Sequence, residues 1–268
     1  MRAEWCDEPP LRFRPLFMSR FDRAVGLARS IAIYQLIPLR QRRLRRLYGQ
    51  FVAAGDLVFD VGAHAGNRTR AFASLGCRVV ALEPQPDFAR LLRVLFSRSP
   101  RVQVLQLAAS EQDGRITLAV SERTPTVTTL DDPWRRIRSR EPGFAGVEWN
   151  QQIEIESAKL DTLIERFGVP AFVKMDVEGS ELRVLNGLSR PLAALSFEYL
   201  PTALPEARAC VARVAELGEY RYNVSVGESY RLISEQWLSA AEALTALESP
   251  YAQTRAGDVY ARLATARA

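Results

Sequence analysis

Acidic side chains end several short apolar segments of the sequence, each of which is expected to be a strand. Asp60, Glu83, Asp176 and Glu198 all stand at such ends. Because the carboxyl ends of parallel strands meet at one edge of an open α/β sheet, we expect these carboxylates to border a common crevice. Carboxylates bind sugar hydroxyls and accept protons, so their placement indicates a site for a hydroxylated ligand and for general acid–base chemistry.

A glycine-bearing turn follows the first of these strands. Gly62 and Gly66 have the spacing Gly-x-x-x-Gly, with His64 between them and a helix expected from Asn67. Glycines at a strand-to-helix turn permit a tight bend and let a ligand approach the backbone closely. The spacing differs from the Gly-x-Gly-x-x-Gly of dinucleotide sites, which counts against a nicotinamide oxidoreductase. S-adenosylmethionine (SAM), the predicted cofactor, carries an amino-acid tail and no phosphate, so its binding needs no pyrophosphate cradle.

The predicted cofactor-binding residues belong to this turn and to the tips of the second and third strands. We expect both oxygens of Glu83 to bind ribose hydroxyls, and the adenine to lie near Ala109. Asp60 has two open interpretations, since it either accepts a bond from a cationic amino group or orders the turn. The full predicted set is Asp60, Gly62, Ala63, His64, Gly66, Thr69, Glu83, Pro84 and Ala109.

The segment from Lys174 to Glu181 places further acids beside a strand end and a helix start. Methyl transfer from a sulfonium is an in-line displacement, so the enzyme must align the reactants and remove the proton of a hydroxyl acceptor. Asp176 or Glu178 is the predicted general base, and Lys174 and Glu198 complete the predicted catalytic set. The alternatives are a structural or cofactor-side role for Asp176, an ion pair for Lys174, and helix capping for Glu178 and Glu181.

Other polar residues have weaker or competing interpretations. Asp176 and Glu198 are also candidates to bind a divalent cation, because oxygen ligands suit magnesium, calcium or manganese, but no metal ligand set is assigned. His64 is either a base or, from its place in the glycine turn, a neighbour of the cofactor. Four more residues either line the acceptor pocket or make loop hydrogen bonds, namely Tyr199, Asn223, Ser225 and Glu228.

Short β-rich runs alternate with helical patterns from residue 56 onward, which predicts βαβ units and a largely parallel sheet. Two alternating runs, 116–120 and 153–156, predict short solvent-facing strands in one or two β-hairpins. They lie in an inserted β/loop segment near 110–160, whose Trp134 and Trp149 would suit a lid over the acceptor. Seven strands of the main sheet are expected, at 57–61, 78–83, 102–107, 172–177, 195–199, 222–226 and 258–263.

Residues 1–50 differ in charge from the rest of the chain. They hold eleven arginines against four acids, whereas the whole chain has a net charge of +5. We expect a basic, mainly helical N-terminal extension here. The cluster Arg40–Arg46 is either a solvated helix face or a docking surface for anionic lipid or another acidic partner, which would give peripheral membrane contact. Nucleic acid is disfavoured, because the sequence has neither the Asn/Asp-Pro-Pro-Tyr tetrad of base-flipping enzymes nor an aromatic-interleaved basic stripe.

The amino-acid composition limits which cellular compartment and which kinds of metal site are expected. Cys6, Cys77 and Cys210 are odd in number and far apart, which favours a reducing, cytoplasmic setting. The longest uncharged apolar stretch near the N-terminus, 30–39, is too short for a bilayer span of about 20 residues. The chain has one histidine, His64, which excludes a multi-histidine metal site.

Three motifs together resemble the FkbM family of methyltransferases, namely Asp60-Val-Gly-Ala-His-Ala-Gly66, Glu83-Pro84 and Lys174-Met-Asp-Val-Glu-Gly-Ser-Glu181. The resemblance runs from about 56 to 199. It implies a class I methyltransferase (Rossmann-like) α/β fold with a seven-stranded, mostly parallel sheet, so we expect residues 51–268 to be the methyltransferase domain. It also implies O-methylation of a small-molecule or glycan acceptor, often a sugar or natural-product hydroxyl. A non-enzymatic or membrane-associated protein on this scaffold and a methyltransferase for another acceptor class stay open, as does the oligomeric state.

Overall fold

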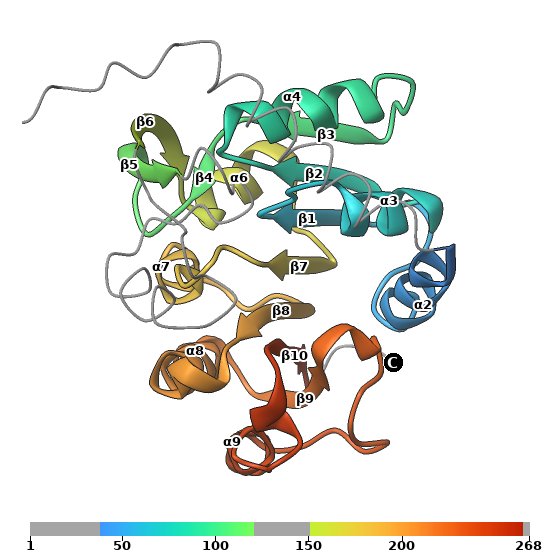
Figure 1. Cartoon of the computed structure of the whole chain (residues 1–268), viewed down its shortest axis with the longest axis vertical. Coiled ribbons are helices and arrows are strands. Elements are labelled where there is room, and N and C mark those ends of the chain that lie inside the picture. The colour runs from blue at the N-terminus through green and yellow to red at the C-terminus, as the bar shows by residue number, and fades with distance from the viewer. Residues whose placement is uncertain (1–37, 121–150, 265–268) are drawn as a thin grey trace, which may run out of the picture.

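A seven-stranded sheet forms the centre of the molecule (Figure 1). The computed structural model describes residues 38–120 and 151–264. The strand order is β3-β2-β1-β7-β8-β10-β9, and in this sheet β10 alone runs opposite to the other six strands. The predicted mostly parallel α/β sheet is therefore confirmed. Its strands are β1 (Leu57–Val61), β2 (Arg78–Leu82), β3 (Val102–Leu105), β7 (Phe172–Met175), β8 (Ala194–Tyr199), β9 (Tyr220–Val226) and β10 (Gly257–Leu263).

All seven strands match predicted ones, and the differences lie at their ends. The second strand ends at Leu82 because Pro84 follows, and a proline cannot extend the ladder with an N–H. The fourth ends at Met175, before a turn in which Glu178 and Gly179 adopt positive φ angles of 53° and 94°. Of the acids expected at strand tips, Glu83 and Asp176 therefore stand just beyond their strands, whereas Asp60 and Glu198 are the second-to-last residues of β1 and β8.

Helices cover both faces of the sheet, with α2 and α3 on one side and α7 and α8 on the other (Figure 1). The alternation along β1 explains the two layers, because Val58 faces one buried cluster and Phe59 the other. All five residues of β1 are buried, as expected of a central strand. The helices are α2 (Pro38–Tyr48), α3 (Asn67–Ser74), α4 (Pro86–Leu95), α6 (Leu160–Phe167), α7 (Glu181–Asn186), α8 (Leu204–Leu217) and α9 (Ala240–Leu247).

A second, three-stranded sheet stands beside the main one. It has the order β4-β6-β5, with β4 (Ala108–Ala109), β5 (Gly114–Val120) and β6 (Gln151–Ala158). The two alternating runs do form strands, and β5 pairs with β6 in antiparallel orientation. The expected solvent-facing character holds for one face only, because Leu118 and Ile155 on the other face are buried. Sequence patterns did not predict β4, since two residues carry no periodicity. The proposed lid residues Trp134 and Trp149 lie outside the described residues.

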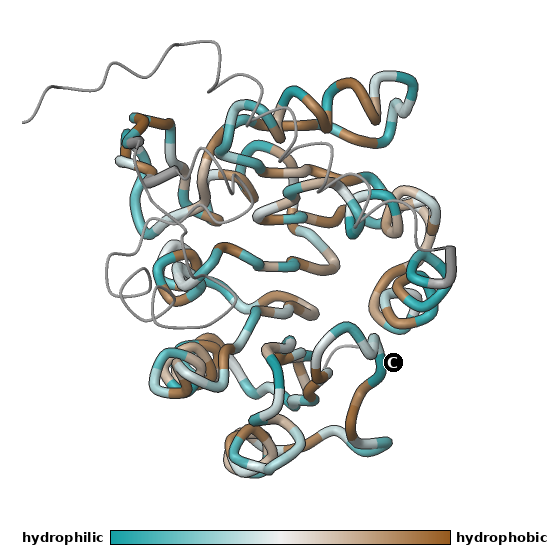
Figure 2. The backbone as a smooth tube through the Cα atoms, viewed as in Figure 1, coloured by the Kyte–Doolittle hydropathy of each residue, from teal (hydrophilic) through white to brown (hydrophobic). Residues whose placement is uncertain are grey.

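Helix α2 is amphipathic, and apolar and polar residues alternate along it (Figure 2). Leu44, Leu47 and Tyr48 are each 1% exposed and pack in the cluster that also contains residues of α3. Arg40 is buried and forms an ion pair with Glu228. The exposed part of the predicted basic cluster is therefore Arg42, Arg43, Arg45 and Arg46. Of the helices in the described ranges, none has the length and apolar character of a membrane span.

Candidate active site

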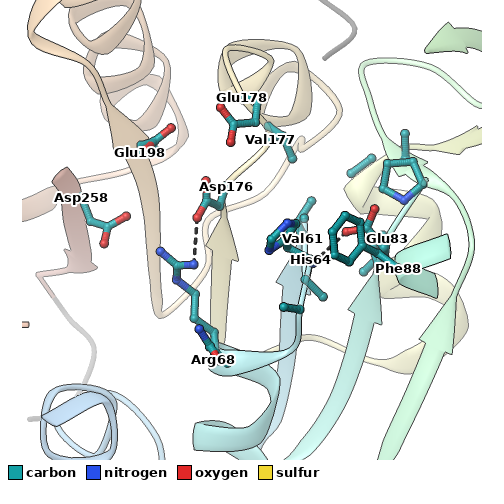
Figure 3. A pocket seen from close by; sticks show the side chains of 18 of the residues that line it. Val61, His64, Arg68, Glu83, Phe88, Asp176, Val177, Glu178, Glu198 and Asp258 are labelled. Atoms are coloured by element: carbon teal, nitrogen blue, oxygen red, sulfur yellow. Dashed lines mark hydrogen bonds and ion pairs between the residues drawn. The ribbon is translucent and has the colours of Figure 1, made fainter. Parts of the chain in front are cut away.

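A cavity of about 270 Å³ opens at the carboxyl ends of β1, β2 and β7, next to Glu198 of β8 and Asp258 at the start of β10. Figure 3 shows two groups of lining side chains. His64, Glu83 and Phe88 form what we call the turn end. Asp176, Glu178, Glu198 and Asp258 form the acidic end, and Arg68 reaches towards it from α3. The four acids that the sequence placed at strand ends do meet at one sheet edge, but only Glu83, Asp176 and Glu198 line the cavity.

The glycine turn is fixed by backbone contacts. Gly62 has φ 78°, and a Cβ atom built there would lie 1.9 Å from the carbonyl oxygen of Asp176. The amides of Gly62 and Ala63 donate to the carbonyl oxygen of Leu82 at 3.0 and 2.9 Å. Only glycine satisfies both the backbone angle and the close approach, which explains the residue at this position. The turn is thus held between the ends of β2 and β7.

Glu83 connects this turn to the end of β2. Its Oε2 accepts the amide of His64 at 2.7 Å, and its Oε1 accepts the amide of Gln85 at 2.9 Å. Burial raises the pKa of Glu83 to about 7, although the two backbone donors counteract this. Each carboxylate oxygen has a second lone pair, so the side chain still has capacity to accept hydroxyl donors in the cavity.

His64 lies against Phe88 of α4, with ring centroids 4.1 Å apart. Burial lowers the pKa of His64 to about 4, so its imidazole is neutral at pH 7. Ala63, Pro84 and Ala109, three more of the residues predicted to bind the cofactor, line the same cavity. The turn end therefore combines an apolar wall with one acidic side chain.

Three of the predicted cofactor residues stand behind the turn and do not line the cavity, namely Asp60, Gly66 and Thr69. Thr69 Oγ1 donates to Asp60 Oδ2 at 2.5 Å, and both residues are fully buried. Gly66 is the N-cap of α3 with φ 82°. Of the two interpretations of Asp60, this geometry matches the one in which it orders the turn.

A chain of ion pairs supports the acidic end. Arg68 Nη1 lies 2.9 Å from Asp176 Oδ2 (Figure 3), which lies 3.9 Å from Lys174 Nζ. Lys174 is fully buried, does not line the cavity, and pairs with Asp258 Oδ1 at 2.8 Å. The geometry therefore favours the ion-pair alternative for Lys174 over contact with a substrate.

Sequence patterns missed two residues of this array. Arg68 follows the glycine turn directly, and its position near the turn was the available signal. Asp258 stands at the start of a strand, where no acid of the parallel strands is expected. Because β10 is reversed, its start lies at the edge where the parallel strands end, and Asp258 is opposite Glu198 in the ladder.

Glu178, Glu181 and Glu198 occupy different environments. Glu181 Oε1 accepts the amide of Val177 at 3.0 Å, so Glu181 holds the turn before α7, and burial raises its pKa to about 7. Glu178 lines the cavity. Burial and the neighbouring carboxyls of Asp176 and Glu178 raise the pKa of Glu198 well above its ordinary value.

Of the four residues that were candidates for the acceptor pocket, one lines the cavity and three do not. Tyr199 donates to the carbonyl of Ala252, Asn223 donates to the carbonyl of Ser234, and Ser225 pairs with a serine hydroxyl. None of these three lines the cavity, so the loop hydrogen-bond alternative holds for them. Glu228 does line it. Among the residues with described positions, no group of three or more His, Cys, Asp or Glu side chains could hold a metal ion, so the divalent cation finds no support.

Comparison with known proteins gives a consistent result. The methyltransferase FkbM domain matches residues 60–233, more than half of the chain. The hexuronic acid methyltransferase AglP of Haloferax volcanii is 28% identical over 169 residues, which cover 62% of this chain and 64% of that protein. This chain thus matches slightly less than two thirds of that relative's length.

Two solved structures overlap most of the chain at low identity. The precorrin-6y C5,15-methyltransferase of Geobacter metallireducens has a TM-score of 0.45 and 12% identity, with 86% of this chain and 91% of that chain covered. The O-methyltransferase of Bacillus cereus, in complex with SAH, has a TM-score of 0.41 and 14% identity, with 94% and 93% covered.

Proposed function

The chain belongs to the FkbM methyltransferase domain family and has a class I methyltransferase fold, and from that premise we propose that it transfers the methyl group of SAM to a hydroxyl of a sugar, glycan or natural product. The observation that carries the proposal is that the turn end and the acidic end line the same cavity. Such a site brings a cofactor-sized surface next to carboxyls able to accept a proton.

The turn end fits the cofactor. Asn67 Oδ1 is buried and has no hydrogen-bond partner in the described residues, and Asn67 lines the cavity, so an acceptor is available there for an ammonium group. In the proposed complex, Glu83 accepts the ribose hydroxyls, and the backbone of Gly62 and Ala63 contacts the methionine part. Ala109 and Phe88 provide apolar surface for the adenine.

When bound, SAM supplies an electrophilic methyl group on a positively charged sulfur. The residues of the chain then have three tasks: to align the acceptor, to exclude water, and to accept the proton of the hydroxyl. The acidic end is placed for the last task, and carboxylates also bind the neighbouring hydroxyls of a sugar. The relative's name, a hexuronic acid methyltransferase, supports a sugar as acceptor class.

An acceptor screen with methyl-labelled SAM tests this function. We expect labelled methyl ethers on one class of hydroxylated compound when the protein is incubated with neutral sugars, uronic acids, amino sugars and phenols in turn. Mass spectrometry of the product identifies the methylated atom. Transfer only to nitrogen or carbon would contradict O-methylation and favour the alternative of another acceptor class.

A further inference from the structure

Glu198 differs from Asp176 and Asp258 in having no hydrogen-bond or ion-pair partner among the described residues. Asp176 is paired with Arg68, and Asp258 is paired with Lys174. The Glu198 side chain lines the cavity but makes no hydrogen bond or ion pair with any residue that the structure describes. Arg68 and Lys174 stabilise the ionised forms of Asp176 and Asp258, whereas no ion pair within the described residues stabilises the ionised form of Glu198.

The charged groups around Glu198 are mostly acidic. The loop after β7 contributes Asp176, Glu178 and Glu181, all of which disfavour a charge on Glu198, while Lys174 of β7 favours it. The adjacent strand β10 contributes Asp258, directly opposite in the ladder. From α8, which also packs against β8, no charged side chain lines the cavity.

The cations nearby are already engaged. Lys174 is fully buried between Asp176 and Asp258, and its ammonium also donates to the carbonyl of Met175 at 2.7 Å. Arg68 is the cation of the described cavity wall, and its guanidinium is bound to Asp176. A further positive charge placed in the cavity would therefore act on Glu198 more than on the paired carboxylates.

We propose that Glu198 is the proton acceptor of the site and that it becomes ionised only when the positively charged sulfonium of SAM is bound beside it. This inference rests on the proposed function and assigns to Glu198 the role that the sequence pattern offered to Asp176 or Glu178. It couples the binding of the correct cofactor form to the readiness of the base, because the product S-adenosylhomocysteine (SAH) carries no such charge.

The charges balance through the step. Glu198 accepts the proton of the acceptor hydroxyl as the new oxygen–carbon bond forms and the carbon–sulfur bond breaks, with the electron pair of the broken bond remaining on sulfur. The positive charge at sulfur and the negative charge at Glu198 are thus lost together. The end state is a neutral carboxyl beside a neutral thioether, as in the protein before the next SAM binds.

Proton release on binding tests the inference without any acceptor. We compare SAM and SAH by isothermal titration calorimetry in buffers of different ionisation enthalpy across about pH 6 to pH 9, which gives the protons released per bound ligand. We expect SAM to release more than SAH, by about half a proton or more at the pH where the difference is largest. Since the two ligands differ only by the methyl group and its charge, the difference isolates the sulfonium.

The variant Glu198→Gln should abolish this difference. Its control is Glu228→Gln, which removes another carboxyl of the cavity wall, one already paired with Arg40, and should keep the difference. Equal proton release by SAM and SAH in the wild-type protein would overturn the proposal, as would a difference that survives Glu198→Gln. Failure of both ligands to bind would instead count against the proposed function.

A second measurement needs only the wild-type protein, in case Glu198→Gln does not fold. If SAM binding releases a proton from Glu198, then by linkage the affinity for SAM relative to SAH must increase as pH rises. We expect this affinity ratio to rise several-fold between about pH 6 and pH 9. A ratio that stays constant over this range would contradict the coupling.

Discussion

The carboxyl groups of this site differ in their hydrogen-bond and ion-pair partners more than in how deeply they are buried. Glu83 and Glu198 both follow or end a strand, and burial raises the pKa of both. Glu83 is held by two backbone amides, which suits a rigid binding contact, whereas Glu198 is surrounded by other acids, which suits a group that takes up and releases a proton. Asp176 has a third environment, an ion pair with Arg68.

The Arg68–Asp176 pair predicts the effect of Arg68→Met. Removing the guanidinium leaves Asp176 among other carboxyls, so we expect unfolding free energy to fall by about 1–3 kcal/mol, between the values typical of exposed and buried pairs. Urea denaturation measures this loss. The control Arg90→Met removes an exposed arginine of α4, for which we expect a change within about 0.5 kcal/mol. Equal effects of the two substitutions would show that the pair does not hold the acidic end.

How far these residues could be predicted depends on the kind of signal they leave. Glu83, Asp176 and Glu198 were predicted because apolar runs lead directly to them. Arg68 and Asp258 were not, since their meaning depends on which distant segments meet. No local pattern contains the reversal of β10 that brings Asp258 to this edge.

At the scale of elements, the turn between β1 and α3 carries the site. Strand positions followed from periodicity and agree closely with the structure, and α3 begins at the predicted Asn67. Periodicity could not predict the contact of the turn with the end of β7. That contact depends on the sheet order β2-β1-β7, which places segments that are far apart in sequence side by side. The two-residue strand β4 was missed for the opposite reason, as it is too short for any pattern.

The turn geometry predicts a severe effect of Gly62→Ala. The added Cβ would collide with the carbonyl of Asp176, and φ 78° is strained for alanine, so we expect both lower stability and loss of SAH binding. Gly55→Ala is the matched control, because Gly55 has φ 92° but nothing within 4 Å of the added atom. That variant should lose about 1–2 kcal/mol from backbone strain and still bind SAH. Thermal unfolding and calorimetry distinguish the two, and unimpaired SAH binding by Gly62→Ala would contradict the geometry.

For the whole molecule, the buried titratable groups predict the dependence of stability on pH. Burial raises the pKa values of Glu83 and Glu181 from the ordinary 4.5 to about 7. Between these two pH values the folded state holds more protons than the unfolded state, so the protein loses stability as pH rises through this window. Burial lowers the pKa of His64 from 6.5 to about 4, so His64 makes stability increase with pH over part of this window. Two carboxyls outweigh one imidazole, and Glu198 adds to them.

We therefore expect the free energy of unfolding to be highest near about pH 5 and to fall by about 3 kcal/mol towards pH 8. Urea denaturation at the two pH values measures the difference. Glu198→Gln removes a carboxyl that makes no hydrogen bond within the described residues, so it should reduce the fall without lowering stability at about pH 5. A protein equally stable at both pH values would contradict the assigned burial of these acids.

The most direct test of the central claim, that the turn end binds SAM, is calorimetric titration of the wild-type protein and Glu83→Gln with SAH. We predict micromolar binding by the wild type and a loss of at least about tenfold in the variant, because glutamine cannot accept from both backbone amides and from ribose hydroxyls. Glu228→Gln, at the same cavity, should bind as the wild type does. A folded wild-type protein that does not bind SAH, or Glu83→Gln binding with unchanged affinity, would contradict the account.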